Sequence, residues 1–167
     1  MTTRLAPDKK TIWSLLSAIT DPEIPVLSIT DLGIVRDVRI DGEDVEVIIT
    51  PTYSGCPAMD VIATGIRLEL EGRGYGKIAV TQVLSPAWTT DWMTETGKEK
   101  LKAYGIAPPQ PQRHTCTPGL FATADAVPCP QCGSWHTKLL SEFGSTACKA
   151  LYQCQDCKEP FDYFKCH

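Results

Sequence analysis

The hydrophobic positions of the first hundred residues switch between a helical and a strand period. In residues 8–20 four apolar side chains recur three or four positions apart, which predicts one buried face of a helix: Ile12, Leu15, Leu16 and Ile19. This helix is expected to end before Asp21-Pro22, because the residue that precedes a proline avoids the helical conformation.

Two segments with β-branched residues in near alternation follow, at residues 33–40 and 44–52. The Asp41-Gly42 pair between them is a strong signal for a tight turn, so the two segments predict a β-hairpin.

The helical period then returns between residues 57 and 74, where an apolar face is formed by Met59, Ile62, Ala63, Ile66 and Leu70. Residues 77–85 predict a third strand, and residues 88–105 predict a third helix with Trp88, Trp92 and Leu101 on its apolar side. The order α-β-β-α-β-α predicts a two-layer α+β domain that spans residues 1–105.

The rest of the chain has a different composition. Residues 105–128 contain five prolines and no clear period, so an extended connection is expected over residues 106–128. Residues 129–167 hold six of the eight cysteines and form the expected second module.

Overall composition narrows the classes of function. The hydrophobic content of 43% and the charged content of 22% are ordinary for a globular protein, and the net charge of −4 gives no field that would attract nucleic acid. The sequence contains no apolar run of the roughly 18 residues that cross a bilayer and no apolar signal core near Met1. A cytoplasmic protein with reduced thiols is therefore expected, and its cysteines are better interpreted as metal ligands than as disulfides.

The second module carries a strong metal-binding pattern. Cys129 and Cys132 form one C-x2-C pair, Cys154 and Cys157 form another, and 21 residues separate the pairs. Two intervening residues allow a tight turn to aim both sulfurs at one ion, so two such turns predict a tetrahedral four-thiolate site. The pattern predicts a zinc ribbon with structural Zn²⁺; iron in a rubredoxin-like site is the alternative.

Several other polar residues of this module are left over. Cys148 and Cys166 are expected to be small buried apolar residues, His136 to be a strand or surface residue, and His167 to be a frayed terminus. The pattern assigns no role to Cys116.

One cysteine lies alone in the first half of the chain. Cys56 follows a predicted strand in a Ser-Gly-Cys-Pro turn and precedes a predicted helix. The free amides of a helix start stabilise a thiolate, so a lowered thiol pKa and a nucleophilic or metal-binding sulfur are expected. A purely structural cysteine remains the alternative.

Three acidic residues could line a metal site with Cys56, although turn and capping roles are favoured for them: Asp21, Glu23 and Asp31.

Three motifs in the first half resemble the family of iron–sulfur assembly domains: Asp-Pro-Glu at residues 21–23, Asp-Leu-Gly-Ile-Val at 31–35 and Cys-Pro at 56–57. The resemblance covers roughly residues 8–85. It implies that Cys56 binds a transient iron–sulfur cluster or iron. Since one cysteine cannot hold a cluster, the resemblance also implies that self-association, a partner or another thiol completes the site.

Nearly the whole chain, including residues 85–109 and the segment 143–167, resembles the PaaD family of phenylacetyl-CoA epoxidase subunits. The resemblance implies an accessory protein of bacterial phenylacetate degradation that matures the iron–sulfur or di-iron components of the epoxidase. Its expected partners are subunits of the epoxidase complex or its reductase, without nucleic acid or membrane. The alternative is an electron carrier in the same system. No catalytic residues are expected, because the sequence shows no nucleophile triad, phosphate loop or catalytic carboxylate pair.

Overall fold

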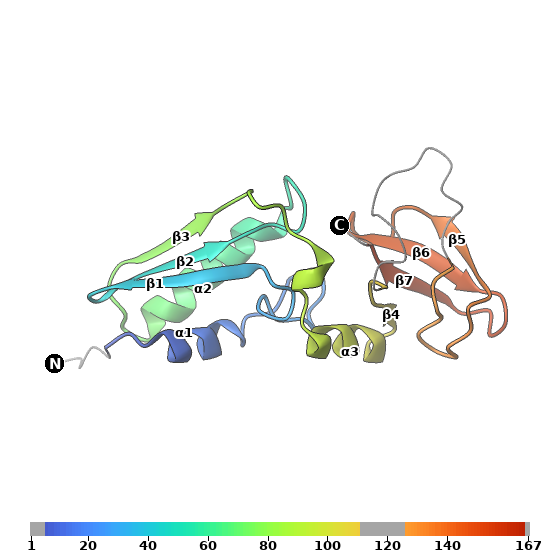
Figure 1. Ribbon diagram of the computed structural model, residues 1–167, viewed down its shortest axis with the longest axis horizontal. Coiled ribbons are helices and arrows are strands. Elements are labelled where there is room, and N and C mark those ends of the chain that lie inside the picture. The colour runs from blue at the N-terminus through green and yellow to red at the C-terminus, as the bar shows by residue number, and fades with distance from the viewer. Residues whose placement is uncertain (1–5, 111–125, 166–167) are drawn as a thin grey trace. The chain divides into compact units, whose positions relative to one another are not determined.

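The computed structural model describes residues 6–110 and 126–165 (Figure 1). The chain divides into two compact units, Met1–Gly97 and Lys98–His167. Among the residues that the structure describes, no helix combines the length and the apolar character needed to cross a bilayer.

The first unit is a three-stranded sheet with two helices against it. Its elements in chain order are α1 (Lys9–Leu16), β1 (Val35–Asp41), β2 (Asp44–Ile49), α2 (Ala58–Gly72), β3 (Ile78–Gln82) and the 3₁₀ helix η1 (Thr90–Trp92). The strand order is β1-β2-β3, with β1 antiparallel and β3 parallel to the central strand β2. α1 packs on β1, α2 packs on β3, and the two helices contact each other. The predicted two-layer α+β arrangement is therefore confirmed.

The apolar faces predicted from the sequence form the core of this unit. On α2 the side chains of Met59, Ile62, Ile66 and Leu70 are buried, as are Ile12 and Leu16 on α1. The opposite face of the sheet is polar, with the Glu46 carboxylate accepting hydrogen bonds from Thr81 and Arg39. One face of the sheet is thus covered and the other carries charge.

The first helix is shorter than expected, because the residues after it pair with a later segment. α1 ends at Leu16, and Ile19 then accepts a backbone hydrogen bond of 2.9 Å from Ile29. Thr20 forms an isolated antiparallel bridge with Ser28. The prediction of a helix up to residue 20 was therefore wrong in its last turn.

The single helix expected over residues 88–105 is interrupted. η1 is followed by Met93 and Thr94, and a separate helix α3 spans Glu95–Ala103. The Thr94 amide donates to the Asp31 carbonyl at 2.9 Å, and the Thr94 hydroxyl accepts from the Gly97 amide at 3.0 Å. These two bonds hold Thr94 outside the helix and cap the start of α3.

The second unit contains a four-stranded sheet. Its strands are β4 (Ile106–Ala107), β5 (Thr137–Ser141), β6 (Lys149–Cys154) and β7 (Pro160–Phe164), in the order β4-β7-β6-β5. β4 and β7 were not predicted from the sequence. Ile106 and Ala107 are both buried and pair in parallel with β7, so the first two residues of the expected 106–128 connection belong to this sheet. The other predicted domain boundaries stay predictions.

Candidate metal centre and the Cys56 loop

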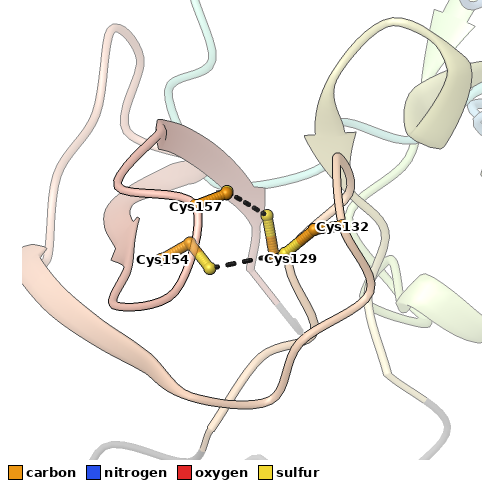
Figure 2. Close-up of side chains that lie close together, drawn as sticks. All are labelled: Cys129, Cys132, Cys154 and Cys157. Carbon is orange, nitrogen blue, oxygen red and sulfur yellow. Dashed lines mark hydrogen bonds between the residues drawn. The ribbon is translucent and has the colours of Figure 1, made fainter.

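The four cysteines of the two C-x2-C pairs converge in the second unit. Their sulfurs all lie within 4.8 Å of one another. Sγ of Cys129 is 3.7 Å from Sγ of Cys157, and Sγ of Cys132 is 3.6 Å from Sγ of Cys154 (Figure 2). All four are free thiols rather than disulfides. The two pairs predicted from sequence spacing are thus brought together.

This arrangement fits a tetrahedral ion. Zinc–thiolate bonds of about 2.3 Å place the sulfurs of a regular tetrahedron roughly 3.8 Å apart. The observed separations of 3.7 Å and 3.6 Å need almost no adjustment. Four thiolates are also the donor set that zinc and iron share in such sites. The donor chemistry and the spacing therefore suit a bound metal, zinc first among them.

The backbone explains why each pair forms a knuckle. In the first, the Cys129 amide donates to the Ser134 carbonyl at 2.8 Å, and the Gly133 amide donates to the Cys129 carbonyl at 2.9 Å. Gly133 adopts a φ of +76°, which a glycine reaches without strain. In the second knuckle the Cys154 amide donates to the Glu159 carbonyl at 3.0 Å.

The thiols of the cluster differ in acidity. The Cys157 amide donates to the Cys154 sulfur and, with further hydrogen bonds, lowers the pKa of Cys154 to about 6. The Glu159 amide lowers the pKa of Cys157 in the same way, but partial desolvation and the three neighbouring sulfurs outweigh it and raise that pKa to about 12. One thiolate thus makes the next harder to form. A divalent cation removes this repulsion, so metal binding releases protons.

The other candidate ligands of this module lie outside the cluster. His136 is exposed, and its Nδ1 lies 3.1 Å from the Asp156 carboxylate. Cys148 is buried, with its sulfur 3.0 Å from the Thr146 hydroxyl, as expected for a small buried residue. The predictions for Cys116, Cys166 and His167 lie outside the described residues.

Cys56 lies in the loop between β2 and α2. The N-cap of α2 is Pro57, so Cys56 lies one residue before the cap and outside the helix. The Cys56 amide donates to the Tyr53 carbonyl at 3.2 Å, and the Cys56 carbonyl accepts from the Met59 amide at 3.3 Å. The residue is half-buried. These bonds fix the thiol at the surface of the first unit without exposing it fully.

The expected acidity of this thiol was wrong. Burial raises the pKa of Cys56 above its ordinary value. The Ala58 amide at the helix start does lower it, as do the side chains of Thr52 and Tyr53, but the nearby Glu23 carboxylate adds to the increase. Desolvation and a like charge therefore outweigh the helix start. The protonated form of Cys56 is therefore more favoured than in an ordinary cysteine.

The acidic residues near this loop serve the backbone. Asp21 accepts hydrogen bonds from the amides of Glu23 and Ile24, at 2.7 Å and 2.9 Å. Asp31 accepts from the Ser28 amide at 3.2 Å and from the Thr94 hydroxyl at 3.2 Å. The favoured turn and capping roles are confirmed for Asp21 and Asp31. Across residues 6–110 and 126–165, the four ribbon cysteines are the only group of three or more metal-binding side chains, so Cys56 has no complete ligand set there.

Comparisons with known proteins agree with this geometry. The model for an iron–sulfur cluster assembly protein matches residues 9–82, and the model for the PaaD zinc beta ribbon domain matches residues 113–165. An Escherichia coli (strain K12) protein, provisionally named as a subunit of 1,2-phenylacetyl-CoA epoxidase, is 54% identical over 160 residues, covering 96% of this chain and 94% of that protein. The chain belongs to the PaaD family of phenylacetyl-CoA epoxidase subunits.

Further relatives match the first half of this PaaD-family chain. A Porphyromonas gingivalis (strain ATCC BAA-308 / W83) protein named Fe-S protein maturation auxiliary factor is 33% identical over 92 residues, which is 54% of this chain and 87% of that protein. A crystal structure of a domain of unknown function, DUF59, from Bacillus anthracis is 28% identical with a TM-score of 0.52, covering 56% of this chain and 90% of that one. Both resemblances stated from the sequence are thus confirmed.

The sequence of this PaaD-family chain was not enough to predict the surroundings of Cys56. The side chains of Thr52 and Tyr53 lower the pKa of its thiol, against the increase caused by burial. The sequence did contain a signal for polar surroundings of the thiol, because four residues with hydroxyl groups come shortly before Gly55-Cys56: Thr50, Thr52, Tyr53 and Ser54.

Proposed function

We propose that this PaaD-family chain is an accessory protein that matures the iron–sulfur or di-iron components of a phenylacetyl-CoA epoxidase system. Three similarities support the proposal: the epoxidase name of the Escherichia coli relative, the iron–sulfur assembly model, and the maturation-factor name of the Porphyromonas gingivalis relative. Its expected partners are subunits of the epoxidase complex or its reductase.

The observation that carries the proposal is the incomplete site at Cys56. The thiol lies in the segment that matches the assembly family, it is half-buried, and no group of three metal donors surrounds it among the described residues. A transient iron–sulfur cluster or iron bound there needs ligands from a second copy, a partner or another thiol. An incomplete ligand set makes the cargo easy to release, which a delivery protein requires.

The protonation state of Cys56 also suits release. The cargo is bound through the thiolate, and burial beside Glu23 favours the thiol. Binding therefore expels a proton from Cys56, and reprotonation favours departure of the metal. The chain thus binds its cargo less tightly than an activated thiolate would.

In this proposal the four cysteines of the second unit hold structural zinc. The ion would neutralise the thiolates of Cys129, Cys132, Cys154 and Cys157 and connect the two knuckles. A small sheet with few large core residues gains much of its folding free energy from such an ion. The ribbon would then act as a stable docking module.

The exposure of two ribbon cysteines favours a second candidate function. Cys132 and Cys157 are exposed, so a metal at this centre would lie close to the surface. An electron carrier needs this arrangement, and iron accepts the same four thiolates. The electron-carrier function would be favoured by about one iron per chain together with a red, redox-active chromophore, both of them lost in Cys154→Ser. Zinc in that site would exclude the electron-carrier function.

The maturation proposal is tested by Cys56→Ser in cells that carry no other copy of this protein. The measurements are epoxidase activity, the iron content of the purified epoxidase components and the zinc content of this chain. We expect loss of activity and of partner iron with the ribbon metal retained. Cys148→Ser is the matched control, because it removes a buried thiol outside both sites. Normal activity and iron loading with Cys56→Ser would show that Cys56 is structural.

A further inference from the structure

The solvent-facing side of the four-cysteine centre lacks the packing that holds its other side. Cys129 and Cys154 belong to the core cluster of the second unit, whereas Cys132 and Cys157 are exposed. Each of the two short sulfur–sulfur separations joins one buried cysteine to one exposed cysteine (Figure 2). The positions of the two exposed sulfurs must therefore be fixed by contacts outside the core.

Polar side chains connect the two segments that carry these exposed sulfurs. The Ser134 hydroxyl donates to one oxygen of the Asp156 carboxylate, and Nδ1 of His136 lies 3.1 Å from the other oxygen. Ser134 and His136 come two and four residues after Cys132, and Asp156 comes directly before Cys157. These contacts therefore join the first knuckle to the second without involving a sulfur.

The backbone reinforces the same connection. The Ser134 carbonyl accepts from the Cys129 amide at 2.8 Å, and the Ser134 hydroxyl accepts from the His136 amide at 3.0 Å. The Gln155 amide of the second knuckle donates to the His136 carbonyl at 2.7 Å. Because the single proton of the Ser134 hydroxyl is donated to the carboxylate, this serine is not poised as a nucleophile, and the arrangement is a structural one.

We propose that Ser134, Asp156 and His136 form a network that positions the exposed sulfurs of Cys132 and Cys157 and slows loss of the ribbon metal. The three are positioning residues, since none of them is among the four sulfur ligands. A chelator reaches the centre first at the exposed cysteines, and a network that keeps the two knuckles together favours the return of a detached sulfur. The inference rests on the proposed structural zinc and specifies what retains it.

Charge and hydrogen bonding make opposite predictions for the loss of Asp156. A divalent ion with four thiolates has a net negative charge, so removal of a nearby carboxylate would strengthen metal binding if charge alone mattered. Loss of the network would weaken metal binding, because the Asp156 carboxylate accepts from Ser134 and faces His136. The direction of the change therefore distinguishes the two effects.

The test measures how fast the zinc-loaded full chain transfers its metal to an excess of a chromophoric chelator. We expect Asp156→Ala and Ser134→Ala to lose zinc about threefold to tenfold faster, the change expected for one lost hydrogen bond. Because the two residues share one bond, the double variant should lose zinc no faster than Asp156→Ala. Ser134→Thr keeps the hydroxyl and should behave like the unaltered protein.

Ser145→Ala is the matched control, because it removes a serine hydroxyl 3.4 Å from the Asp162 carboxylate, in the same unit but outside both knuckles. This variant should lose zinc at the unaltered rate. Amide exchange of β5–β7 in the zinc-bound Ser134→Ala and Asp156→Ala proteins should equal that of the unaltered protein. Lost protection there would show that the network holds the fold rather than the exposed sulfurs, and would overturn the inference.

The remaining outcomes separate the network from the metal itself. Unchanged or slower zinc loss in Asp156→Ala would overturn the network and leave the structural zinc standing. Rate increases that multiply in the double variant would do the same, since they would show that Ser134 and Asp156 act independently. An unaltered chain that binds no zinc would overturn both the network and the proposed zinc.

Discussion

Removing the metal from the four-cysteine centre should unfold the second unit and leave the first unit folded. Its core cluster includes Cys129 and Cys154, so two of the four expected ligands are packed in the interior of this unit. The large buried aromatic side chains of its sheet are Tyr152, Phe161 and Phe164. At about 1.5–3 kcal/mol each, they supply about 5–9 kcal/mol. Structural zinc in small modules contributes about 10–16 kcal/mol, so the sheet should not survive its loss.

Amide hydrogen exchange read by mass spectrometry is a suitable assay, because it reports each unit separately. After treatment with a strong chelator, peptides that cover β5, β6 and β7 should exchange fully within the dead time of the measurement. Peptides from β1, β2 and α2 should keep the protection they have in the untreated protein. Cys154→Ser should reproduce the chelator result without any chelator.

The matched control is Cys148→Ser, which alters a buried cysteine next to β6 but outside the sulfur cluster. This variant should bind one metal ion and keep β5–β7 protected. If the metal-free protein, with its metal loss verified by mass, still protects β5–β7, the argument that the ion folds this sheet is refuted. Exchange of both units together would instead show that their folding is coupled.

Three further changes test other parts of the structure. Gly33→Ala should destabilise the first unit by about 3 kcal/mol in urea unfolding, because φ is +70° and an added Cβ would lie 2.4 Å from a backbone oxygen; an unchanged midpoint would contradict the tight approach. Asp162→Ala should destabilise the second unit by about 2 kcal/mol, since buried Lys149 then loses the carboxylate 3.5 Å away, and Lys149→Met should restore part of the loss. Iodoacetamide should alkylate Cys56 half-maximally at a higher pH than it alkylates a cysteine in a short unfolded peptide, because burial and Glu23 raise its pKa, and Glu23→Gln should lower that pH; a midpoint at or below that of the peptide would exclude the raised pKa.

The fold was predictable where one strong local signal decided each element. The Asp41-Gly42 turn and the alternation around it determined the β1–β2 hairpin, and the apolar period of α2 determined its buried face. The metal centre was predictable for the same reason, since the C-x2-C spacing restricts where two sulfurs can point. Such signals depend only on neighbouring residues.

The errors arose where distant residues compete with local preference. Residues 17–20 fit a helix, but pairing with residues 28–29 holds them outside it. The helix start next to Cys56 favours a thiolate and so a lowered pKa. Burial and Glu23, which is 33 positions earlier in the chain, raise the pKa instead. Residues 50–54 line a small cavity together with Leu84, Ala87 and Trp88, and no hydrophobic period in the sequence predicts that these two segments meet.

The pairing of β4 with β7 has a consequence for how the second unit is handled in the laboratory. A fragment that begins at residue 113, where the ribbon family model begins, leaves out Ile106 and Ala107, so β7 would present an unpaired edge to solvent. Exposed strand edges promote intermolecular pairing, so such a fragment should be prone to aggregate. A fragment that begins at Lys98 retains the edge strand.

Similarly, a protease cut between residues 111 and 125 would leave β4 attached to the sheet only by hydrogen bonds and packing. The two pieces of the chain should then copurify until they are denatured.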